Sequence, residues 1–341
     1  MKISKEKFGM MNGKEIYEYT LDNENGLVVK IIEYGAIIRE INYKGYNRVL
    51  GYNTLDEYLV DKNSFGAAIG RVAGRISGAE ITIGDDVYKL DSNEGANCLH
   101  GGNHGFGKVA WEFHEEIINA TSISLVLKHL DKDRENGFPG NLQTYIKYTL
   151  GKYNSLVIDY NARSDKDTLI TLTNHTYFNL DDDFSDNILF HKLRIDADRY
   201  ISLDGNSIPL GIKNTEGTVF DFREEKYIGR DMNLEDQELK ETLGYDHPFI
   251  LNKSTVNEIE LFSEKSGVRM SVQTTEPVVV VYAGNKFDEK TTFGKDVRLK
   301  KYHGIALETQ WYPDAINQKF LPDNILKRGE EYHSRTRFIF N

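Results

Sequence analysis

Hydrophobic and polar residues alternate along many short stretches of the chain, and turn signals separate these stretches. Alternation with a period of two places one set of side chains on each face of a β-strand. Turn signals such as Asn23-Glu24-Asn25-Gly26 and Gly84-Asp85-Asp86 lie between the stretches. The pattern predicts strands over residues 27–34, 39–43, 80–83, 88–90, 122–127, 143–150, 155–161, 169–173, 189–195, 268–274, 278–283 and 304–308.

Helix signals are few. Thr54 is expected to cap a helix of one or two turns over residues 54–59. Asn233 is expected to cap a second helix over residues 234–243, which Gly244 would end. Many short strands without alternating long helices are typical of a sandwich rather than of βαβ units. The sequence therefore predicts an all-β fold, a large antiparallel β-sandwich with few short helices.

Length and charge narrow the class of partner. A chain of 341 residues suggests two domains, but an all-β architecture can hold this length in one unit, so length does not decide the domain count. The formal net charge of −11 argues against a nucleic-acid or anionic-membrane partner, because both require basic patches. This charge suits a neutral substrate.

Cysteine content and the N-terminus bear on the compartment. Cys98 is the one cysteine, so an intramolecular disulfide and a cysteine metal site are excluded, which fits a reducing compartment. Residues 1–11 are charged and lack the apolar stretch of a signal peptide. No stretch approaches the ~20 apolar residues that span a bilayer. We expect a cytoplasmic protein.

The first candidate for chemistry is Glu308, on the predicted strand that Pro313-Asp314 ends. Alternation places Glu308 on the same face as Ala306 and Gln310. A rigid strand positions a reacting carboxylate well, and a small neighbour leaves room for a ligand. On this stretch alone, a glutamate on the solvent-exposed face is the commoner case.

Two glycine-containing loops carry further candidates. Arg71 and Arg75 lie in a glycine-containing loop over residues 70–76. The fork of N–H donors on an arginine suits sugar hydroxyls or carboxylates. Two solvated surface charges are equally compatible with the pattern. Residues 97–108 contain His100 and His104 but lack the order of a phosphate loop. No partner set with metal-ligand spacing accompanies these histidines, so no metal site is expected.

Two polar positions and an acidic run complete the candidates. His175 follows a predicted strand. A histidine at such a position more often has a structural role, held by hydrogen bonds. Its ordinary pKa near neutrality nevertheless suits a general acid. Asp246 lies next to a predicted helix end, on a loop stiffened by Pro248, where it could accept from two hydroxyls or simply form a turn. Residues 181–186 lack the spacing and glutamate of a calcium-binding EF-hand, which favours a solvated loop.

Six segments, taken together and in order, resemble the galactose mutarotase (aldose 1-epimerase) family. Each motif alone is weak, but six in family order are highly specific, and they cover the chain from about residue 30 to its end. The matching segments are residues 70–76, Leu99-His100-Gly101-Gly102, Gly137-Phe138-Pro139-Gly140, residues 173–180, Asp246-His247-Pro248-Phe249, and Leu307-Glu308-Thr309-Gln310 with Pro313-Asp314-Ala315.

The resemblance implies a single-domain β-sandwich over residues 1–341 that interconverts the α and β anomers of free hexoses such as D-galactose and D-glucose, without a cofactor or metal. By motif, Glu308 corresponds to the general base and His175 to the general acid, with His100 a second candidate donor to the ring oxygen. The positions that correspond to substrate-binding residues are Arg75, His100, Asp246, Tyr177 and Gly74. Oligomeric state stays open between monomer and homodimer.

Two positions depart from the family pattern. Gly74 stands where many relatives have Asn, and Val280 stands where some have Gln. Both departures leave the preferred hexose open, but they leave the acid–base pair intact. With ordinary pKa values of ~4.3 and ~6.5, a carboxylate and an imidazole start in opposite protonation states close to neutral pH.

Two alternative functions remain at this point. An epimerase for hexose 6-phosphates would need an anion site, which Arg71 and Lys108 could supply; the acidic chain and the hydroxyl-accepting Asp246 argue against it. A non-catalytic sugar-binding protein would keep Arg75 and Asp246. It would not need both Glu308 and His175, whose joint presence favours an enzyme.

Overall fold

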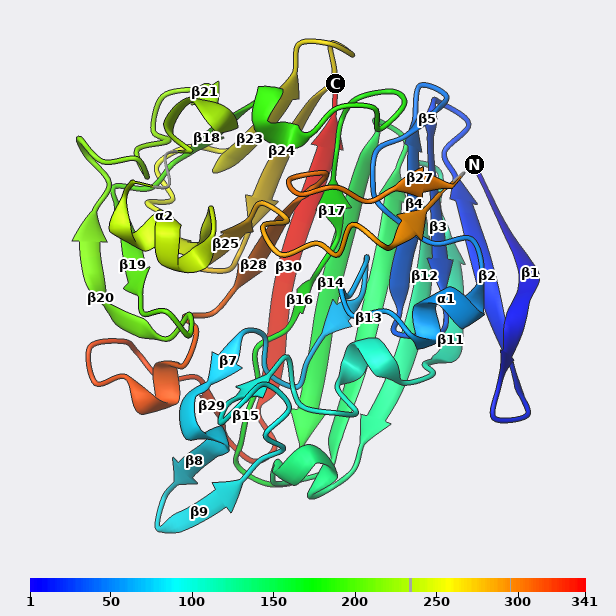
Figure 1. Cartoon of the computed structure of the whole chain (residues 1–341). Helices are drawn as coiled ribbons and strands as arrows, with labels where there is room; N and C mark the ends of the chain where they lie inside the picture. The colour runs from blue at the N-terminus through cyan, green and yellow to red at the C-terminus, as the bar shows by residue number, and fades with distance from the viewer. Residues whose placement is uncertain (233–234, 295) are drawn as a thin grey trace.

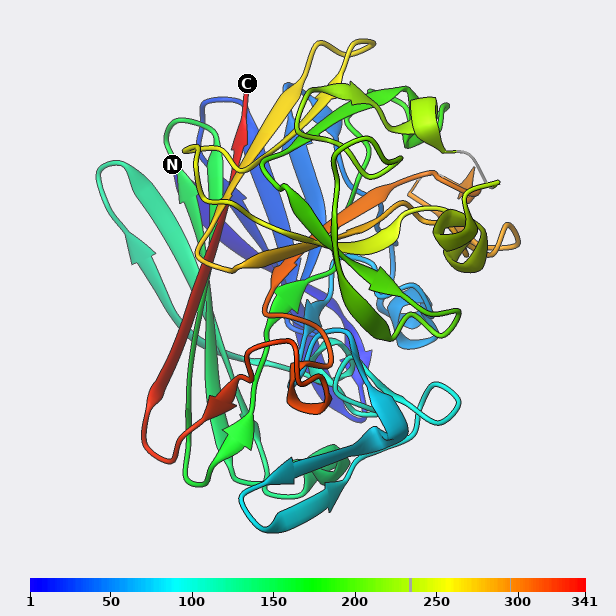
Figure 2. The same ribbon diagram turned by 90° about the vertical axis from the view of Figure 1, so that its left-hand side faces the viewer.

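Antiparallel strands dominate the computed structural model of this protein, which describes residues 1–232, 235–294 and 296–341 (Figure 1). Three sheets of five, nine and six strands hold most of the strands. In the turned view, the C-terminal strand and its neighbours lie along the left side, and the six-stranded sheet lies to their right (Figure 2). The predicted all-β antiparallel fold is confirmed.

The five-stranded sheet is an N-terminal meander in which each strand pairs with the next. Its buried face, with Leu21, Val29 and Ile41, belongs to the same hydrophobic cluster as Leu125 and Ile146 of the nine-stranded sheet. The two sheets therefore pack face to face. The strands are β1 (Lys2–Met11), β2 (Lys14–Asp22), β3 (Leu27–Ile32), β4 (Ile37–Tyr43) and β5 (Tyr46–Asn47).

The nine-stranded sheet shows the period-two pattern most clearly. Along β13, residues from Leu142 to Leu150 alternate between buried and partly exposed positions. One face is thus hydrophobic core, and the other remains polar. In spatial order the strands are β11 (Glu112–Ile118), β12 (Ser122–Asp131), β13 (Leu142–Gly151), β14 (Ser155–Ser164), β30 (Glu331–Phe340), β24 (Arg269–Thr274), β23 (Ile259–Ser263), β18 (His191–Ile195) and β21 (Lys226–Tyr227).

The six-stranded sheet carries β28, which is buried at every position. Ile305 and Leu307 on one face join the main core, whereas Ala306 on the other face joins a second cluster with Tyr177. This sheet is therefore covered on both sides near its middle. Its order is β17 (Tyr177–Phe178), β28 (Ile305–Gln310), β25 (Val278–Tyr282), β22 (Asp246–Ile250), β19 (Arg199–Leu203) and β20 (Pro209–Asn214).

Five two-stranded ladders lie outside these three sheets in the described residues. The prediction of one strand over 169–173 is wrong, because β15 ends at Leu169 and β16 begins at Thr173, each with a different partner. The short strands are β6 (Ala68–Ile69), β7 (Arg75–Ile76), β8 (Glu80–Ile83), β9 (Asp86–Lys89), β10 (Cys98–Leu99), β15 (Thr168–Leu169), β16 (Thr173–Asn174), β26 (Thr292–Phe293), β27 (Val297–Arg298) and β29 (Ile325–Leu326).

Two short α-helices occur in the described residues. Thr54 caps α1 (Leu55–Leu59) through a capping box, as predicted. Helix α2 (Gln237–Thr242) begins later than predicted, because the Asp236 side chain accepts from two backbone N–H groups at its start. Asn233 and Leu234 lie outside the described residues. No helix in the described part of the chain has the length and apolarity needed to cross a membrane.

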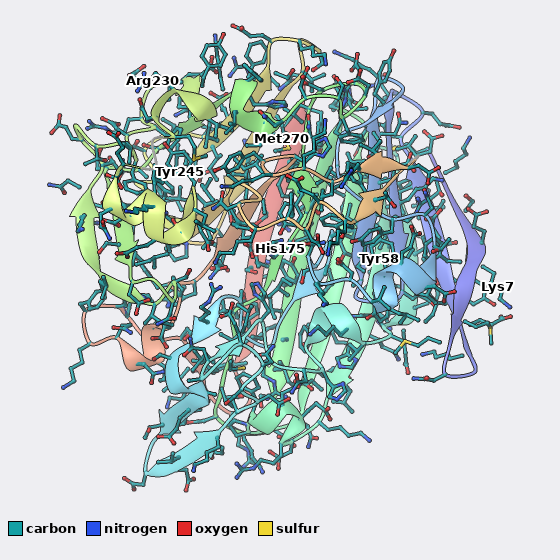
Figure 3. All side chains as sticks on the ribbon, viewed as in Figure 1. Lys7, Tyr58, His175, Arg230, Tyr245 and Met270 are labelled. Atoms are coloured by element: carbon teal, nitrogen blue, oxygen red, sulfur yellow. The ribbon has the colours of Figure 1, made fainter. Side chains whose placement is uncertain are left out.

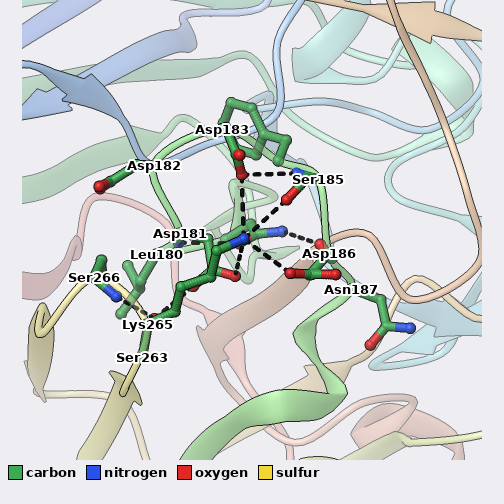
Figure 4. A network of polar contacts seen from close by, with 12 residues as sticks. Leu180, Asp181, Asp182, Asp183, Ser185, Asp186, Asn187, Ser263, Lys265 and Ser266 are labelled. Carbon is green, nitrogen blue, oxygen red and sulfur yellow. Dashed lines mark hydrogen bonds and ion pairs between the residues drawn. The ribbon is translucent and has the colours of Figure 1, made fainter.

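The acidic run 181–186 forms a loop around Lys265 of the neighbouring hairpin (Figure 4). The Lys265 ammonium lies 2.8 Å from a carboxylate oxygen of Asp186 and 3.4 Å from one of Asp183, and it donates to the Ser185 hydroxyl. A lysine of the chain therefore supplies positive charge among these carboxylates. The exposed side chains of Asp183 and Asp186 agree with the predicted solvated loop, whereas Asp181 is buried.

Candidate active site

All seven residues predicted to form the site line one cavity of about 430 Å³, although they come from five different parts of the chain. His175 lies near the middle of the molecule (Figure 3). The predicted residues that line this cavity are Gly74, Arg75, His100, His175, Tyr177, Asp246 and Glu308. The structure thus brings them together, which the sequence alone could not establish.

Glu308 is held on β28 and faces into the cavity. β28 pairs with β25, in register that places Glu308 beside Val280. Glu308 is 4% exposed, which excludes the alternative of a solvent-exposed glutamate that the strand on its own left open. Burial raises the pKa of Glu308 to about 8, with a further contribution from the charge of Asp246 that Arg75 partly offsets.

His175 is fixed by its backbone immediately after β16. Its N–H donates to the carbonyl of Ala67, and its own carbonyl accepts from the N–H of Gly66. Nε2 of His175 lies 3.5 Å from Oε1 of Glu308, while Nδ1 is buried and has no hydrogen-bond partner in the described residues. Burial lowers the pKa of His175 to about 4.

The Glu308–His175 pair therefore differs from the expected one. At neutral pH the free site favours a neutral carboxylic acid and a neutral imidazole, rather than a carboxylate and an imidazolium. The two groups are in opposite protonation states, as predicted, but the proton lies on Glu308 rather than on His175, because burial disfavours the charged form of both groups. The pair still carries one proton over the pH range between the two pKa values.

His100 contributes a hydrogen-bond donor to the cavity. Nδ1 of His100 accepts from the backbone N–H of Gly74 at 3.2 Å, which assigns the remaining ring proton to Nε2. The ring meets that of His175 edge to face, with centroids 5.4 Å apart. Burial, followed by the nearby His175 and Arg75, lowers the pKa of His100 well below its ordinary value, so the ring is neutral.

The same hydrogen bond bears on metal binding. Ligand atoms of His100, His175 and Glu308 lie within 4.8 Å of one another, a spacing that a metal ion could exploit. A metal ligand must offer a lone pair, yet Nδ1 of His100 already accepts from Gly74 and Nε2 carries the proton. The donor set therefore fits hydrogen bonding to a ligand better than it fits metal coordination.

Arg75 and Glu94 form a paired fork at one wall. Nε of Arg75 donates to Oε2 of Glu94 at 2.6 Å, and a terminal nitrogen donates to Oε1 at 2.8 Å. Such bidentate pairs fix the plane of the guanidinium. The positive charge of the Arg75 guanidinium also interacts electrostatically with Asp246 and Glu308.

Asp246 occupies the first position of β22 rather than a loop, which corrects the prediction. It pairs with Tyr282 of β25, and the Ser207 hydroxyl lies 3.4 Å from its Oδ2. Pro248 is tolerated in this strand because β19 pairs with β22 only at Phe249 and Ile250. Burial raises the pKa of Asp246, although Arg75 opposes the shift.

The two departures from the family pattern and one missed residue lie close together. Gly74 has a φ of +77°, and a Cβ placed on it would lie 3.5 Å from Nε2 of Gln310 and from Cβ of Pro313. Val280 lines the cavity beside Glu308. Gln310, two positions after Glu308 on the same strand face, also lines the cavity. Its alternation with Glu308 was the signal that could have identified it.

Arg71 does not belong to the site. Its guanidinium is buried, lies 2.7 Å from a carboxylate oxygen of Asp131 and donates to the carbonyl of Pro139. Arg71 therefore links the end of β12, at Asp131, to the backbone of Pro139 and Gly140. The anion site suggested by Arg71 with Lys108 is not formed, since only Lys108 of the two lines the cavity.

Comparison with known proteins agrees with this geometry. The sequence model of the family described as Aldose 1-epimerase matches residues 17–338. The chain belongs to the aldose 1-epimerase family. An Aldose 1-epimerase of Haemophilus influenzae is 36% identical over 342 residues, covering 98% of both chains. A Galactose mutarotase of Sus scrofa is 36% identical over 323 residues, covering 92% of this chain and 91% of the relative.

Solved structures of this family share the fold. The crystal structure of galactose 1-epimerase from Lactobacillus acidophilus NCFM superposes with a TM-score of 0.90 at 32% identity, covering 100% of this chain and 98% of the other. The aldose epimerase homologue from C. elegans has a TM-score of 0.86 at 30% identity, covering 94% of this chain and 98% of the other. Membership in this family makes the protein an isomerase.

Proposed function

We propose that this protein interconverts the α and β anomers of free hexoses, D-galactose and D-glucose first among them. The observation that carries the proposal is the 3.5 Å contact between Nε2 of His175 and Oε1 of Glu308 within one cavity. The names of relatives support the substrate, since one is a galactose mutarotase and another a galactose 1-epimerase. We further propose that residues 1–341 act as one domain.

Anomers interconvert by ring opening to the free aldehyde, rotation about C1–C2, and closure on the other face. The opening step starts from the less populated single-proton form of the pair, in which the proton lies on His175. The carboxylate of Glu308 then takes the proton of the C1 hydroxyl while the C1–ring oxygen bond breaks. The imidazolium of His175 gives its proton to the ring oxygen. Closure reverses both proton transfers and so resets the pair.

The buried environment assists this opening step. With a pKa of about 8, Glu308 is a stronger base than an ordinary carboxylate, and with a pKa of about 4, protonated His175 is a stronger acid than an ordinary imidazolium. The neutral acid and neutral imidazole that follow ring opening are the forms that burial favours. Burial therefore favours the two proton transfers once the carboxylate–imidazolium form is reached, and the same burial makes that form the minor one in the free site.

The surrounding residues would bind and orient the sugar. Arg75, held by Glu94, donates to ring hydroxyls, and Asp246 accepts from them. Nε2–H of His100 is a second donor toward the ring oxygen. The Tyr177 ring, 4.8 Å from that of His175 between centroids, supplies an apolar wall.

Polarimetry of freshly dissolved α-D-galactose tests the proposal. Catalytic amounts of protein are expected to accelerate the approach to anomeric equilibrium beyond the rate in buffer. An unchanged rate would contradict the proposed function. Galactose binding in calorimetry without acceleration would indicate a non-catalytic sugar-binding protein, and acceleration confined to galactose 6-phosphate would indicate a sugar-phosphate epimerase.

A further inference from the structure

A second groove lies on the nine-stranded sheet and is separate from the cavity that contains Glu308 and His175. It has a volume of about 540 Å³, within the roughly 300–1,000 Å³ of small-molecule sites, and it shares no lining residue with that cavity. Strands β12, β13, β14, β30 and β24 contribute to it, together with the loop between β22 and β23. The proposed anomer chemistry uses none of these residues.

The strand register explains why the groove is hollow. Leu156 and Ile158 of β14 belong to the hydrophobic core, so Val157 between them lies on the opposite face of the sheet. Thr149 of β13 and Arg337 of β30 pair with Val157 from its two sides. Because Thr149 and Val157 are short and Arg337 is long, a hollow remains over the two short side chains beside the guanidinium.

The loop that joins β22 to β23 forms one wall of the groove and carries a buried acceptor. Val256 of this loop is exposed, whereas Glu258 is 7% exposed. Oε1 of Glu258 lies 3.4 Å from the Lys253 ammonium, but Oε2 is buried and has no hydrogen-bond partner among the described residues. Buried polar atoms are normally paired. A ligand hydroxyl in the groove would supply the missing donor to Glu258.

Lys147 is a cation of the groove without a partner. Its ammonium makes no hydrogen bond or ion pair within the part of the chain that the structure describes. Asp159 stands opposite Lys147 in the register of β13 and β14, but its carboxylate accepts from Nε of Arg335, and Nε2 of His333 lies 3.5 Å from it. The charge of Asp159 is therefore already balanced, and that of Lys147 is not.

Arg337 is the second cation that the groove leaves largely unsatisfied. Among the described residues its guanidinium makes one hydrogen bond, a 3.4 Å contact from a terminal nitrogen to the Ser155 hydroxyl, and its Nε is buried without a partner. A guanidinium offers a planar fork of donors that matches an oxyanion, and an ammonium adds a point charge. Arg337 and Lys147 thus give the groove an excess of positive charge on a chain whose formal net charge is −11.

We propose that this groove binds a hydroxylated phosphate ester of the size of a hexose phosphate. Its phosphate lies at Arg337 and Lys147, and one of its hydroxyls donates to Glu258. A neutral sugar would leave both cations without a counter-charge. Inorganic phosphate would leave the Glu258 acceptor and much of the volume unused. Binding involves no covalent step and does not depend on the proposed anomer chemistry.

Calorimetric titration of the full chain with glucose 6-phosphate and with inorganic phosphate tests the inference. Both titrations contain excess D-galactose, which is expected to occupy the cavity at Glu308 and His175. The wild-type protein is expected to bind the ester with a Kd of about 1 mM or tighter, and about fivefold or more tightly than inorganic phosphate. Arg337→Gln and Lys147→Gln should each lower the affinity for the ester by about tenfold.

The same two variants should leave anomer exchange and thermal unfolding unchanged, because neither residue lines the cavity of Glu308 and His175. Arg163→Gln is the matched control. Arg163 is an exposed arginine that lies on the same face of β14 as Val157 by the period of two, but outside the groove. Its substitution should not change the affinity for the ester.

Four outcomes would overturn the inference. The first is no binding of glucose 6-phosphate, and the second is equal affinity for the ester and for inorganic phosphate. The third is an affinity for the ester that Arg163→Gln lowers as much as Arg337→Gln does, since the attraction would then be a diffuse effect of surface charge. The fourth is ester binding that excess D-galactose abolishes, since the ester would then occupy the other cavity. None of these outcomes bears on whether the protein accelerates anomer exchange, which polarimetry tests separately.

Discussion

Nε2 of His175 lies 3.5 Å from Oε1 of Glu308, although His175 follows β16 near the middle of the chain and Glu308 belongs to β28 near its end. Nδ1 of His175 and Oε2 of Glu308 are buried and have no partner among the described residues. Buried polar atoms are normally paired. A ligand hydroxyl would supply a missing partner at a site that the fold leaves incomplete.

The pH dependence of activity follows from the shared proton of this pair. The expected kcat/KM for galactose is level between pH values of about 4 and about 8, and it falls on both sides, because the pair loses its single-proton form there. Initial rates across this range, corrected for the buffer reaction, measure the profile. A single transition near pH 6.5 would instead indicate an ordinary histidine and contradict the assignment.

His100 is expected to act as a neutral donor. His100→Ala should lower kcat/KM by about 10- to 100-fold, since it removes the Nε2–H group that faces the cavity. The exposed His114→Ala is the matched control and should have no effect. The tautomer itself is measurable by nitrogen-15 NMR of the imidazole. A proton found on Nδ1 would contradict the hydrogen bond from Gly74.

Glu94 is expected to position Arg75 rather than to take part in the proton transfers. Glu94→Gln weakens the bidentate pair, so KM should rise by about 3- to 10-fold with a smaller change in kcat, because the pair is partly exposed and its interaction is screened. Glu80→Gln, at an exposed position outside the cavity, is the control. A collapse of kcat at constant KM would place the Arg75–Glu94 pair in the chemical step.

Glu276 links stability to pH at a place remote from the proposed chemistry. Burial raises the pKa of Glu276 from 4.5 to about 7, so the folded protein retains this proton after the unfolded chain has lost it. The stabilisation is therefore complete below pH 4.5 and is lost as pH rises through 7.

Glu276→Gln should consequently raise the free energy of unfolding at pH 8 by up to about 3 kcal/mol and leave it nearly unchanged near pH 4.5. Urea unfolding at the two pH values measures the difference. The exposed Glu6→Gln provides a control without a buried carboxyl. Equal effects of Glu276→Gln at both pH values would show that the carboxyl does not titrate as inferred.

The sequence predicted the strand that carries Glu308 but not its burial. Alternation along 304–310 marks two faces, and it cannot say that the sheet is covered on both of them. Long-range packing against Tyr177 and the main core decides this. The reversed pKa values of the pair follow from the same packing and were beyond sequence reasoning.

Edge and irregular elements were the hardest to predict. β11 is exposed along nearly its whole length, so it lacks an alternating pattern, and β1 is similarly exposed at the edge of its sheet. Pro248 suggested a loop at Asp246, yet a partly unpaired strand accommodates it. The ordered motifs nevertheless identified the family, and all seven residues taken from these motifs line the cavity.

The most direct test of the account is the turnover of galactose anomers by Glu308→Gln, measured by NMR exchange at equilibrium. The variant keeps the shape of the side chain and removes the proton acceptor. The account predicts a loss of about 10²- to 10⁴-fold in kcat with a smaller change in KM. A large rise in KM with unchanged kcat would contradict it, because Glu308 would then bind the sugar without taking its proton.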